Sequence, residues 1–289
     1  MIEITILSGK GGAGKTSVAA ALASVAKNVV FCDNDVDAAD LHLIFNPEIK
    51  ETYDFDSGTV ALIDPEICTN CGLCEEHCRF DAIHPNASEQ LEVNPIQCEG
   101  CRLCERICPV NAIESVHNFN NHWYVSETRF GTLVHAKMGP GEENSGKLVT
   151  EVRRKAKEIA TKRKADFMIN DGPPGIGCSA IASLTGTDAV LLIIEPTLSG
   201  LHDAKRLVEL VNSFHIPVFA VINKFDINKE ITQKVADYLL ENKIPLIGSL
   251  PFTTKMVESM VHGKTIVEYI PEEQISKEFF SIWDKIFRN

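Results

Sequence analysis

The chain has 289 residues, of which 44% are hydrophobic and 24% are charged, a composition typical of a globular protein that buries a large core. The formal net charge is −12, and the one basic stretch, residues 153–164, has the spacing of a solvated helix face, so we do not expect nucleic acid as a partner. No apolar run approaches the ~20 residues that span a membrane, so no membrane span is expected.

A glycine-rich loop separates the first predicted strand from the first predicted helix. Residues 3–8 are short, apolar and β-branched, GKGGAGKT follows at 9–16, and an alanine-rich stretch continues to about Lys27. In this context a G-x-x-x-x-G-K-T loop binds phosphate, because its backbone N–H groups and the helix N-terminus surround the anion. Lys15 is therefore expected to reach the β- and γ-phosphates of ATP, and the Thr16 hydroxyl to ligate Mg²⁺. The residues predicted to bind the nucleotide here are Gly9, Lys10, Gly11, Gly12, Ala13, Gly14, Lys15, Thr16 and Ser17.

Eight of the ten cysteines form two copies of a C-x2-C-x2-C-x3-C pattern, at 68–78 and 98–108. This spacing is typical of cubane iron–sulfur clusters, in which three close thiolates bind one cluster and the fourth binds the other. A zinc site is the alternative, but zinc ribbons pair two C-x-x-C knuckles and do not use the third and fourth cysteines. Thiolate ligands need a reducing compartment and the chain begins directly on a strand without a signal peptide, so we expect a cytoplasmic protein.

The segment from Thr59 to His117 resembles a bacterial-type ferredoxin with two [4Fe–4S] clusters, although Arg79 stands where the first copy usually has a proline. The resemblance implies two ligand sets, Cys68, Cys71, Cys74 and Cys108 for one cluster and Cys98, Cys101, Cys104 and Cys78 for the other.

Predicted strands and helices alternate along the rest of the chain. Strands are expected at 29–32, 166–170, 189–195, 218–223 and 245–250, and helices near 145–163, 178–186, 200–214, 228–242, 252–262 and 275–287. Such alternation favours a parallel sheet with helices on both faces. The predicted fold class is α/β, a doubly wound and mostly parallel P-loop NTPase sheet at 1–58 and 118–289, with an inserted small α+β ferredoxin-like domain at 59–117.

The second lysine of the loop, Lys10, gives the form KGGxGKT, which resembles the deviant P-loop of the MinD/ParA family. Other segments fit this resemblance, which spans the whole chain except the insert: Asp33-Asn34-Asp35 resembles the D-x-D switch I, 171–175 the D-x-P-P-G switch II, Asn223-Lys224 the base-side asparagine, and 249–252 the last base-side loop.

The resemblance implies a role for each matching residue. Lys10 would cross a dimer interface to the partner's nucleotide, and Asp35 would help to place the attacking water. Asp171 would support Mg²⁺, and the Gly175 backbone would sense the γ-phosphate. On the base side, Asn223 would lie against the base and Pro251 would belong to the neighbouring loop.

Two further features leave alternatives open. Cys178 lies seven residues after Asp171, the offset at which the nitrogenase iron protein of this family holds a cluster between subunits, but a thiol without a ligand role fits as well. The glycine-rich residues 135–147 form either a lid or docking loop or a plain connection.

The sequence as a whole predicts an ATPase that binds Mg²⁺ and ATP, carries two [4Fe–4S] clusters and works as a nucleotide-gated homodimer coupling ATP to electron transfer. Two other functions stay open: a carrier that inserts a cluster or metal into an apo-metalloprotein, and a regulatory ATPase that senses cluster redox state. Clusters that are fully cysteine-ligated and cross-braced favour electron transfer with a redox partner over delivery, because they are held rather than donated.

Overall fold

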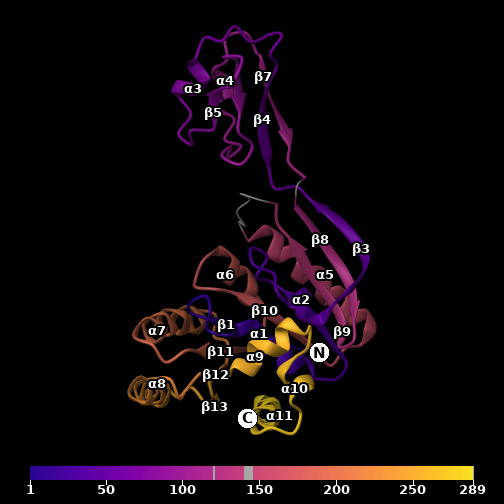
Figure 1. Cartoon of the computed structure of the whole chain (residues 1–289), viewed down its shortest axis with the longest axis vertical. Coiled ribbons are helices and arrows are strands. Elements are labelled where there is room, and N and C mark those ends of the chain that lie inside the picture. Colours follow the sequence, from indigo (N-terminus) through magenta and orange to yellow (C-terminus); the bar gives the residue numbers. More distant parts are fainter. Residues whose placement is uncertain (120, 140–145, 289) are drawn as a thin grey trace. The chain divides into compact units, whose positions relative to one another are not determined.

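The computed structural model describes residues 1–119, 121–139 and 146–288, and the chain divides into two compact units (Figure 1). The first, which we call the sheet unit, comprises Met1–Thr52, Trp123–Ala136 and Asn144–Asn289. The second, which we call the cysteine unit, comprises Tyr53–His122 and Lys137–Glu143, a wider span than the predicted insert at 59–117.

The described residues contain a nine-stranded sheet in the order β13-β12-β11-β1-β10-β2-β9-β8-β3. In this order the strands are Leu246–Leu250, Val218–Asn223, Ala189–Ile194, Ile2–Ser8, Phe167–Pro174, Val29–Asp33, Gly131–Lys137, Asn121–Thr128 and Glu48–Phe55. Every neighbouring pair from β13 to β9 is parallel, which confirms the prediction of a mostly parallel α/β sheet. The central strands are buried along almost their whole length because helices cover both faces, which explains their continuous apolar sequences.

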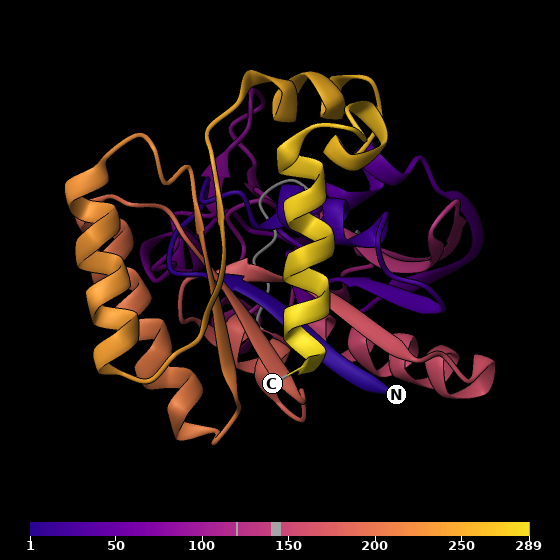
Figure 2. The same ribbon diagram turned by 90° about the horizontal axis from the view of Figure 1, so that it is seen from below.

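Helices pack on the two faces of this sheet. Their bounds are α1 Lys15–Ala23, α2 Leu41–Phe45, α5 Lys147–Arg163, α6 Cys178–Leu184, α7 Leu198–Ser213, α8 Lys229–Glu241, α9 Thr254–Val261, α10 Ile266–Tyr269 and α11 Gln274–Arg288. Buried side chains of α1, α2, α10 and α11 share one apolar core, and those of α6, α7 and α8 share another. Figure 2 shows α11, in yellow, running alongside the strands. Polar side chains begin several helices: Thr197 and Asn228 accept N–H groups from the first turns of α7 and α8.

Strands β3, β8 and β9 extend the sheet beyond the strands that the sequence analysis had placed. Most residues of β3 are exposed, so this strand lacks the apolar run that identifies the central strands. Arg129, between β8 and β9, donates hydrogen bonds to the carbonyls of Ile44 (3.0 Å) and Phe45 (2.8 Å) at the end of α2. This extension corrects part of the prediction for residues 135–147: 135–137 end β9 with His135 buried, and 140–145 lie outside the described residues.

The cysteine unit is built from two small antiparallel sheets and two short helices. β4 (Thr59–Ile63) pairs with β7 (Ile113–His117), and β5 (Ile83–Pro85) pairs with β6 (Leu91–Val93). The helices are α3 (Leu73–Glu76) and α4 (Leu103–Ile107). Cys74 is buried in the core of the unit together with Ala61, Ile83, Leu91 and Ile113.

Candidate nucleotide site and cysteine-lined cavities

The glycine-rich loop lines a cavity of about 620 Å³ in the sheet unit. The cavity lies at the carboxyl edge of the parallel strands, where ligands bind in open α/β sheets, and its volume is in the range of small-molecule sites. Residues 11–17 of the loop contribute to its wall. Gly14 has φ +91°, and a Cβ there would lie 2.3 Å from Nδ2 of Asn223, so only glycine fits this turn.

Lys15 lines the cavity and faces two carboxylates, of which that of Asp35 also lines the cavity and that of Asp171 does not. Its Nζ lies 3.2 Å from Oδ2 of Asp35 and 3.8 Å from Oδ1 of Asp171, and only 6% of its side chain is exposed. Burial by itself lowers the pKa of Lys15, but the attraction of Asp171 and Asp35 outweighs it, so the pKa is raised. Lys15 is therefore a permanent cation at the position where a phosphate would be held.

Asp171 has the properties of a cation site. Its carboxylate is fully buried, and among the described residues neither oxygen accepts a hydrogen bond of standard geometry. Burial raises the pKa of Asp171, while Lys15 and the Thr16 hydroxyl lower it in part. The pKa of Asp33 is also raised, first by burial and further by repulsion from Asp171. A buried carboxylate that accepts no close hydrogen bond is stabilised by further positive charge, so these oxygens and the Thr16 hydroxyl suit Mg²⁺.

Lys10 lies outside the lining of this cavity and pairs within its own chain. Its Nζ is 2.8 Å from Oε2 of Glu195 and 3.1 Å from Oγ1 of Thr197. Glu195 also binds Lys224, whose Nζ is 2.9 Å from Oε1, and Lys224 donates to the Gly12 carbonyl at 3.0 Å. Burial opposes ionisation of Glu195, but hydrogen bonds from Lys10 and Lys224 more than compensate and lower its pKa.

The residues predicted to lie beside the base line the cavity, and so does a helix that was predicted from the sequence but not assigned to the site. Nδ2 of Asn223 donates to the Ala13 carbonyl at 2.8 Å, so the side chain is fixed beside the loop. Pro251 lines the cavity, and so do side chains of α9 that sequence reasoning missed, Met256, Val257 and Met260. Their only signal was the apolar spacing of a helix directly after the base-side loop.

Gly9 and Gly175 of the predicted site are not part of the lining. The backbone N–H of Gly175 donates to the Ser8 carbonyl at 3.0 Å, which ties the switch II turn to the end of β1. A Cβ on Gly9 would lie 2.5 Å from Asp203, so this glycine allows α7 to approach the loop.

The cysteine unit contains two cavities whose walls carry different cysteines. One is lined by Cys68, Cys71, Cys74 and Cys108, and the other by Cys74, Cys78, Cys98, Cys101 and Cys104. All ten cysteines are free of disulfides. In the described part of the chain, no three His, Cys, Asp or Glu side chains converge on one point as they would around a single metal ion.

The donor set of these cavities suits iron–sulfur chemistry better than a single-ion site. A cubane takes one thiolate at each of four iron corners, so its ligands surround a volume and need not converge. Burial raises the pKa of the Cys104 thiol to about 11. Ligation requires the thiolate, so a group bound here has to supply the compensating positive charge.

Comparison with known proteins agrees with the geometry of the nucleotide site. The family described as CobQ/CobB/MinD/ParA nucleotide binding domain matches residues 4–266. An uncharacterized protein of Methanocaldococcus jannaschii is 37% identical over 231 residues, covering 79% of this chain and 80% of the relative. An iron-sulfur cluster carrier protein of Pyrococcus abyssi is 24% identical over 308 residues, covering 98% and 85%.

Solved structures share the fold. The septum site-determining protein MinD of Pyrococcus horikoshii, complexed with Mg-ADP, superposes with a TM-score of 0.59 at 19% identity, covering 99% of this chain and 96% of that chain. Among the described residues, none of the helices is long and apolar enough to cross a membrane. The family match and the phosphate-binding loop lead to one conclusion: this chain belongs to the CobQ/CobB/MinD/ParA nucleotide-binding family and is an ATP-binding ATPase of the MinD/ParA type.

Proposed function

We propose that the protein is a Mg²⁺-dependent ATPase that carries two [4Fe–4S] clusters and, as a nucleotide-gated homodimer, couples ATP binding and hydrolysis to electron transfer. The observation that carries this proposal is the division of eight cysteines between two cavities of the cysteine unit. Apart from Cys74, which reaches both walls, the division follows the two ligand sets implied by the ferredoxin spacing. Bound clusters would supply one-electron redox chemistry.

In the nucleotide site, the chain's own groups would bind and orient ATP. Backbone N–H groups of the loop and the Lys15 ammonium would hold the phosphates, and the Thr16 hydroxyl with Asp171 would hold Mg²⁺. A phosphate at Lys15 would compete with Asp35, whose Oδ2 is 3.2 Å from the same nitrogen. ATP binding would therefore release the Asp35 carboxylate, which could then accept a hydrogen bond from the attacking water. Burial raises the pKa of Asp35, which makes the released carboxylate a better proton acceptor.

Lys10 completes the proposal for a dimer. Its ion pair with Glu195 holds it beside Thr197 in its own chain. In the proposed dimer, Lys10 leaves Glu195 and binds the phosphates of the partner's nucleotide, which makes hydrolysis depend on association.

The experiment that tests the cluster content is iron and sulfide analysis of protein purified without oxygen. Two cubanes correspond to about eight iron and eight sulfide per chain. Cys108→Ser should remove the cluster held with Cys68 and leave the other, so the iron content should fall by about half. Cys32→Ser is the matched control outside the cysteine unit and should keep all the iron. Zinc in place of iron, or full iron content in Cys108→Ser, would contradict the proposal.

A second candidate function is cluster delivery. It is favoured by the likeness to the Pyrococcus abyssi protein, which is named an iron-sulfur cluster carrier protein. Cys71 and Cys101 are exposed, so an acceptor's thiols could reach one thiolate of each set. Incubation of the loaded protein with an apo-ferredoxin and ATP distinguishes the two functions: a carrier loses iron to the acceptor, whereas an electron-transfer protein keeps its iron.

A further inference from the structure

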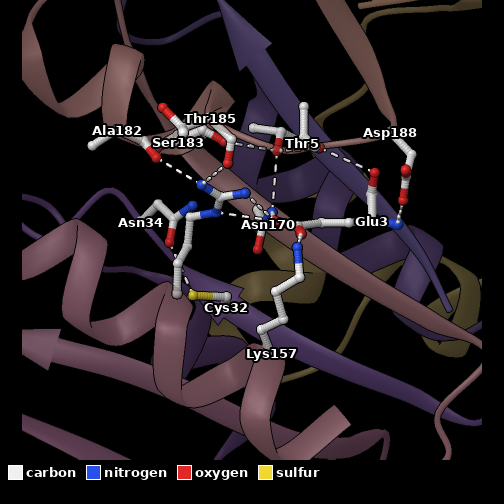
Figure 3. Close-up of polar contacts among 12 residues, drawn as sticks. Glu3, Thr5, Cys32, Asn34, Lys157, Asn170, Ala182, Ser183, Thr185 and Asp188 are labelled. Atoms are coloured by element: carbon white, nitrogen blue, oxygen red, sulfur yellow. Dashed lines mark hydrogen bonds and ion pairs between the residues drawn. The ribbon is translucent and has the colours of Figure 1, made fainter. Parts of the chain in front are cut away.

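A buried carboxylate, Glu3, lies on the face of the sheet that α5 covers and accepts hydrogen bonds from four donor atoms. Its residue is only 1% exposed although it stands near the start of the first strand. Arg153 donates through Nε (3.0 Å) and Nη2, Lys157 through Nζ (3.0 Å), and Asn170 through Nδ2 (2.9 Å). Figure 3 shows Glu3 between Lys157 and Asn170. A charge buried this deeply is tolerated only when it is paired and hydrogen-bonded.

The network binds both ends of the switch II segment. Asn170 directly precedes Asp171 in β10, and it also donates to Oγ1 of Thr5 at 3.1 Å. On the far side of the switch, Arg153 Nη1 donates to the carbonyls of Ala182 (2.7 Å) and Thr185 (2.9 Å), at the end of α6. These carbonyls have no partner within the helix, so Arg153 supplies the missing donor.

The position of Asp171 depends on this strand as well as on Lys15 and Thr16 of the loop, because the contacts of its carboxylate with these two side chains are long or poorly aligned. Nζ of Lys15 lies 3.8 Å from Oδ1 of Asp171 and the Thr16 hydroxyl interacts with the same carboxylate, but among the described residues neither oxygen accepts a hydrogen bond of standard geometry. Side chains alternate along a strand, so Asn170 and Asp171 point to opposite faces. A shift of β10 that moves Asp171 must also pull Asn170 away from Glu3 and Thr5.

Switch I is connected to the same strand. The backbone N–H of Asn34, between Asp33 and Asp35, donates to the Asp171 carbonyl at 2.8 Å. The Asn34 side chain lies on the same face as Glu3 and accepts the Cys32 thiol at 2.9 Å (Figure 3). The strands that carry both switches are therefore fixed from the face of the sheet that carries Glu3 and Asn170.

We infer that Arg153, through Glu3 and Asn170, is the positioning residue that sets the Mg²⁺ affinity of Asp171. It fixes the strand before switch II and the helix after it, and so it limits where the Asp171 carboxylate can lie. Arg153 touches neither the nucleotide cavity nor the loop. This inference rests on the proposed Mg²⁺ site at Asp171 and Thr16, and it predicts an effect on the metal that is separate from nucleotide binding.

The experiment measures metal affinity directly. Mn²⁺ replaces Mg²⁺, ADP is present, and free Mn²⁺ is counted by its EPR signal for wild-type protein and variants. Glu3→Leu combined with Arg153→Met removes both buried charges, a replacement that buried pairs often tolerate, and the Lys157 ammonium that loses Glu3 is 52% exposed and can be solvated. We expect its Mn²⁺ dissociation constant to rise on the order of tenfold, as for other residues that orient metal ligands. Its ADP dissociation constant in EDTA should stay within about twofold of the wild-type value.

The controls separate the alternatives. Lys157→Gln removes a half-exposed positive charge beside the same carboxylate and should leave Mn²⁺ affinity unchanged. Arg153→Lys keeps the positive charge beside Glu3 but cannot donate to both α6 carbonyls as well, so its Mn²⁺ dissociation constant should rise less than that of the double variant. It serves as the test if the double variant does not fold. An unchanged Mn²⁺ dissociation constant in the folded double variant overturns the inference. So does a loss of ADP affinity in EDTA as large as the loss of Mn²⁺ affinity. If Thr16→Ala also binds Mn²⁺ normally, the proposed Mg²⁺ site itself is wrong.

Discussion

Lys10 and Glu195 form an ion pair within one chain, with Nζ 2.8 Å from Oε2. The side chains are 28% and 17% exposed, so the pair is partly screened by solvent. Release of Lys10 therefore has a modest cost, about 1 kcal/mol or less. This cost is low enough for a phosphate with several negative charges to displace Glu195.

Glu195→Gln should make ATP-driven dimerisation easier, because Lys10 then leaves a neutral amide. We expect association at up to about fivefold lower protein concentration, which corresponds to about 1 kcal/mol.

Lys10→Ala should still bind ATP as a monomer but lose association and most hydrolysis. Sedimentation velocity with ATP and with ADP measures this, and Glu230→Gln in the exposed pair with Lys234 is the matched control. Normal association of Lys10→Ala would show that this lysine has no role between subunits.

Lys15→Ala should weaken ATP binding by about 1.5–3 kcal/mol, the contribution of a hydrogen bond to a charged group. This corresponds to a rise of roughly tenfold to 150-fold in the ATP dissociation constant. Isothermal titration calorimetry measures it, and Lys27→Ala, just beyond α1 and exposed, should bind ATP as the wild type does. An unchanged ATP constant in Lys15→Ala would exclude a phosphate contact.

Asp171→Asn should stabilise the nucleotide-free protein at neutral pH while weakening its metal binding. Burial raises the pKa of Asp171 in the fold, so the folded state binds more protons than the unfolded state and this residue's contribution to stability is lost as pH rises through the folded pKa. The neutral amide of Asp171→Asn does not titrate and loses no stability in this range. The unfolding free energy of the variant should therefore exceed that of the wild type above pH 4, by about 1.4 kcal/mol for each unit by which the fold raises the pKa of Asp171.

Urea unfolding of both proteins at pH 4, 6 and 8, without nucleotide or Mg²⁺, checks this prediction. Glu158→Gln provides a control in which the stability change has the opposite sign. The hydrogen bond from Lys162 lowers the pKa of Glu158, so this substitution should not stabilise the protein as pH rises. Equal unfolding free energies of Asp171→Asn and wild type at all three values would refute a raised pKa.

ATP affinity should depend on the redox state of the clusters if the two units are energetically coupled. Binding free energies are reciprocal, so any effect of ATP on cluster potential requires an equal effect of reduction on ATP affinity. A shift of 59 mV in a one-electron couple corresponds to about a tenfold change. Dissociation constants for ATP in the oxidised and dithionite-reduced protein measure this, with a Cys108→Ser variant as the control that lacks one cluster. Equal constants would remove the argument for a redox-coupled ATPase.

Features that depend on neighbouring residues could be predicted from the sequence. The loop at 9–16 needs only a strand before it and a helix after it, so its glycines and Lys15 identify a phosphate site without tertiary information. The central strands could be located for a related reason, since burial on both faces selects an unbroken apolar run such as 189–194. The resemblance to ferredoxins, carried by the cysteine spacing, also implied the division of cysteines on which the cluster proposal depends.

Contacts between distant residues were decided by the tertiary structure. Strand β3 is exposed and polar, so no periodic signal distinguishes it from a loop until it pairs at the edge of the sheet. Lys10 and Glu195 are 185 residues apart, and Arg153 and Glu3 are 150 apart. From the sequence, a charged residue is expected at the surface, because the hydrophobic pattern predicts the burial of apolar residues only. Folding alone brings Glu3 and Arg153 together in the core, where each is the partner that makes burial of the other tolerable.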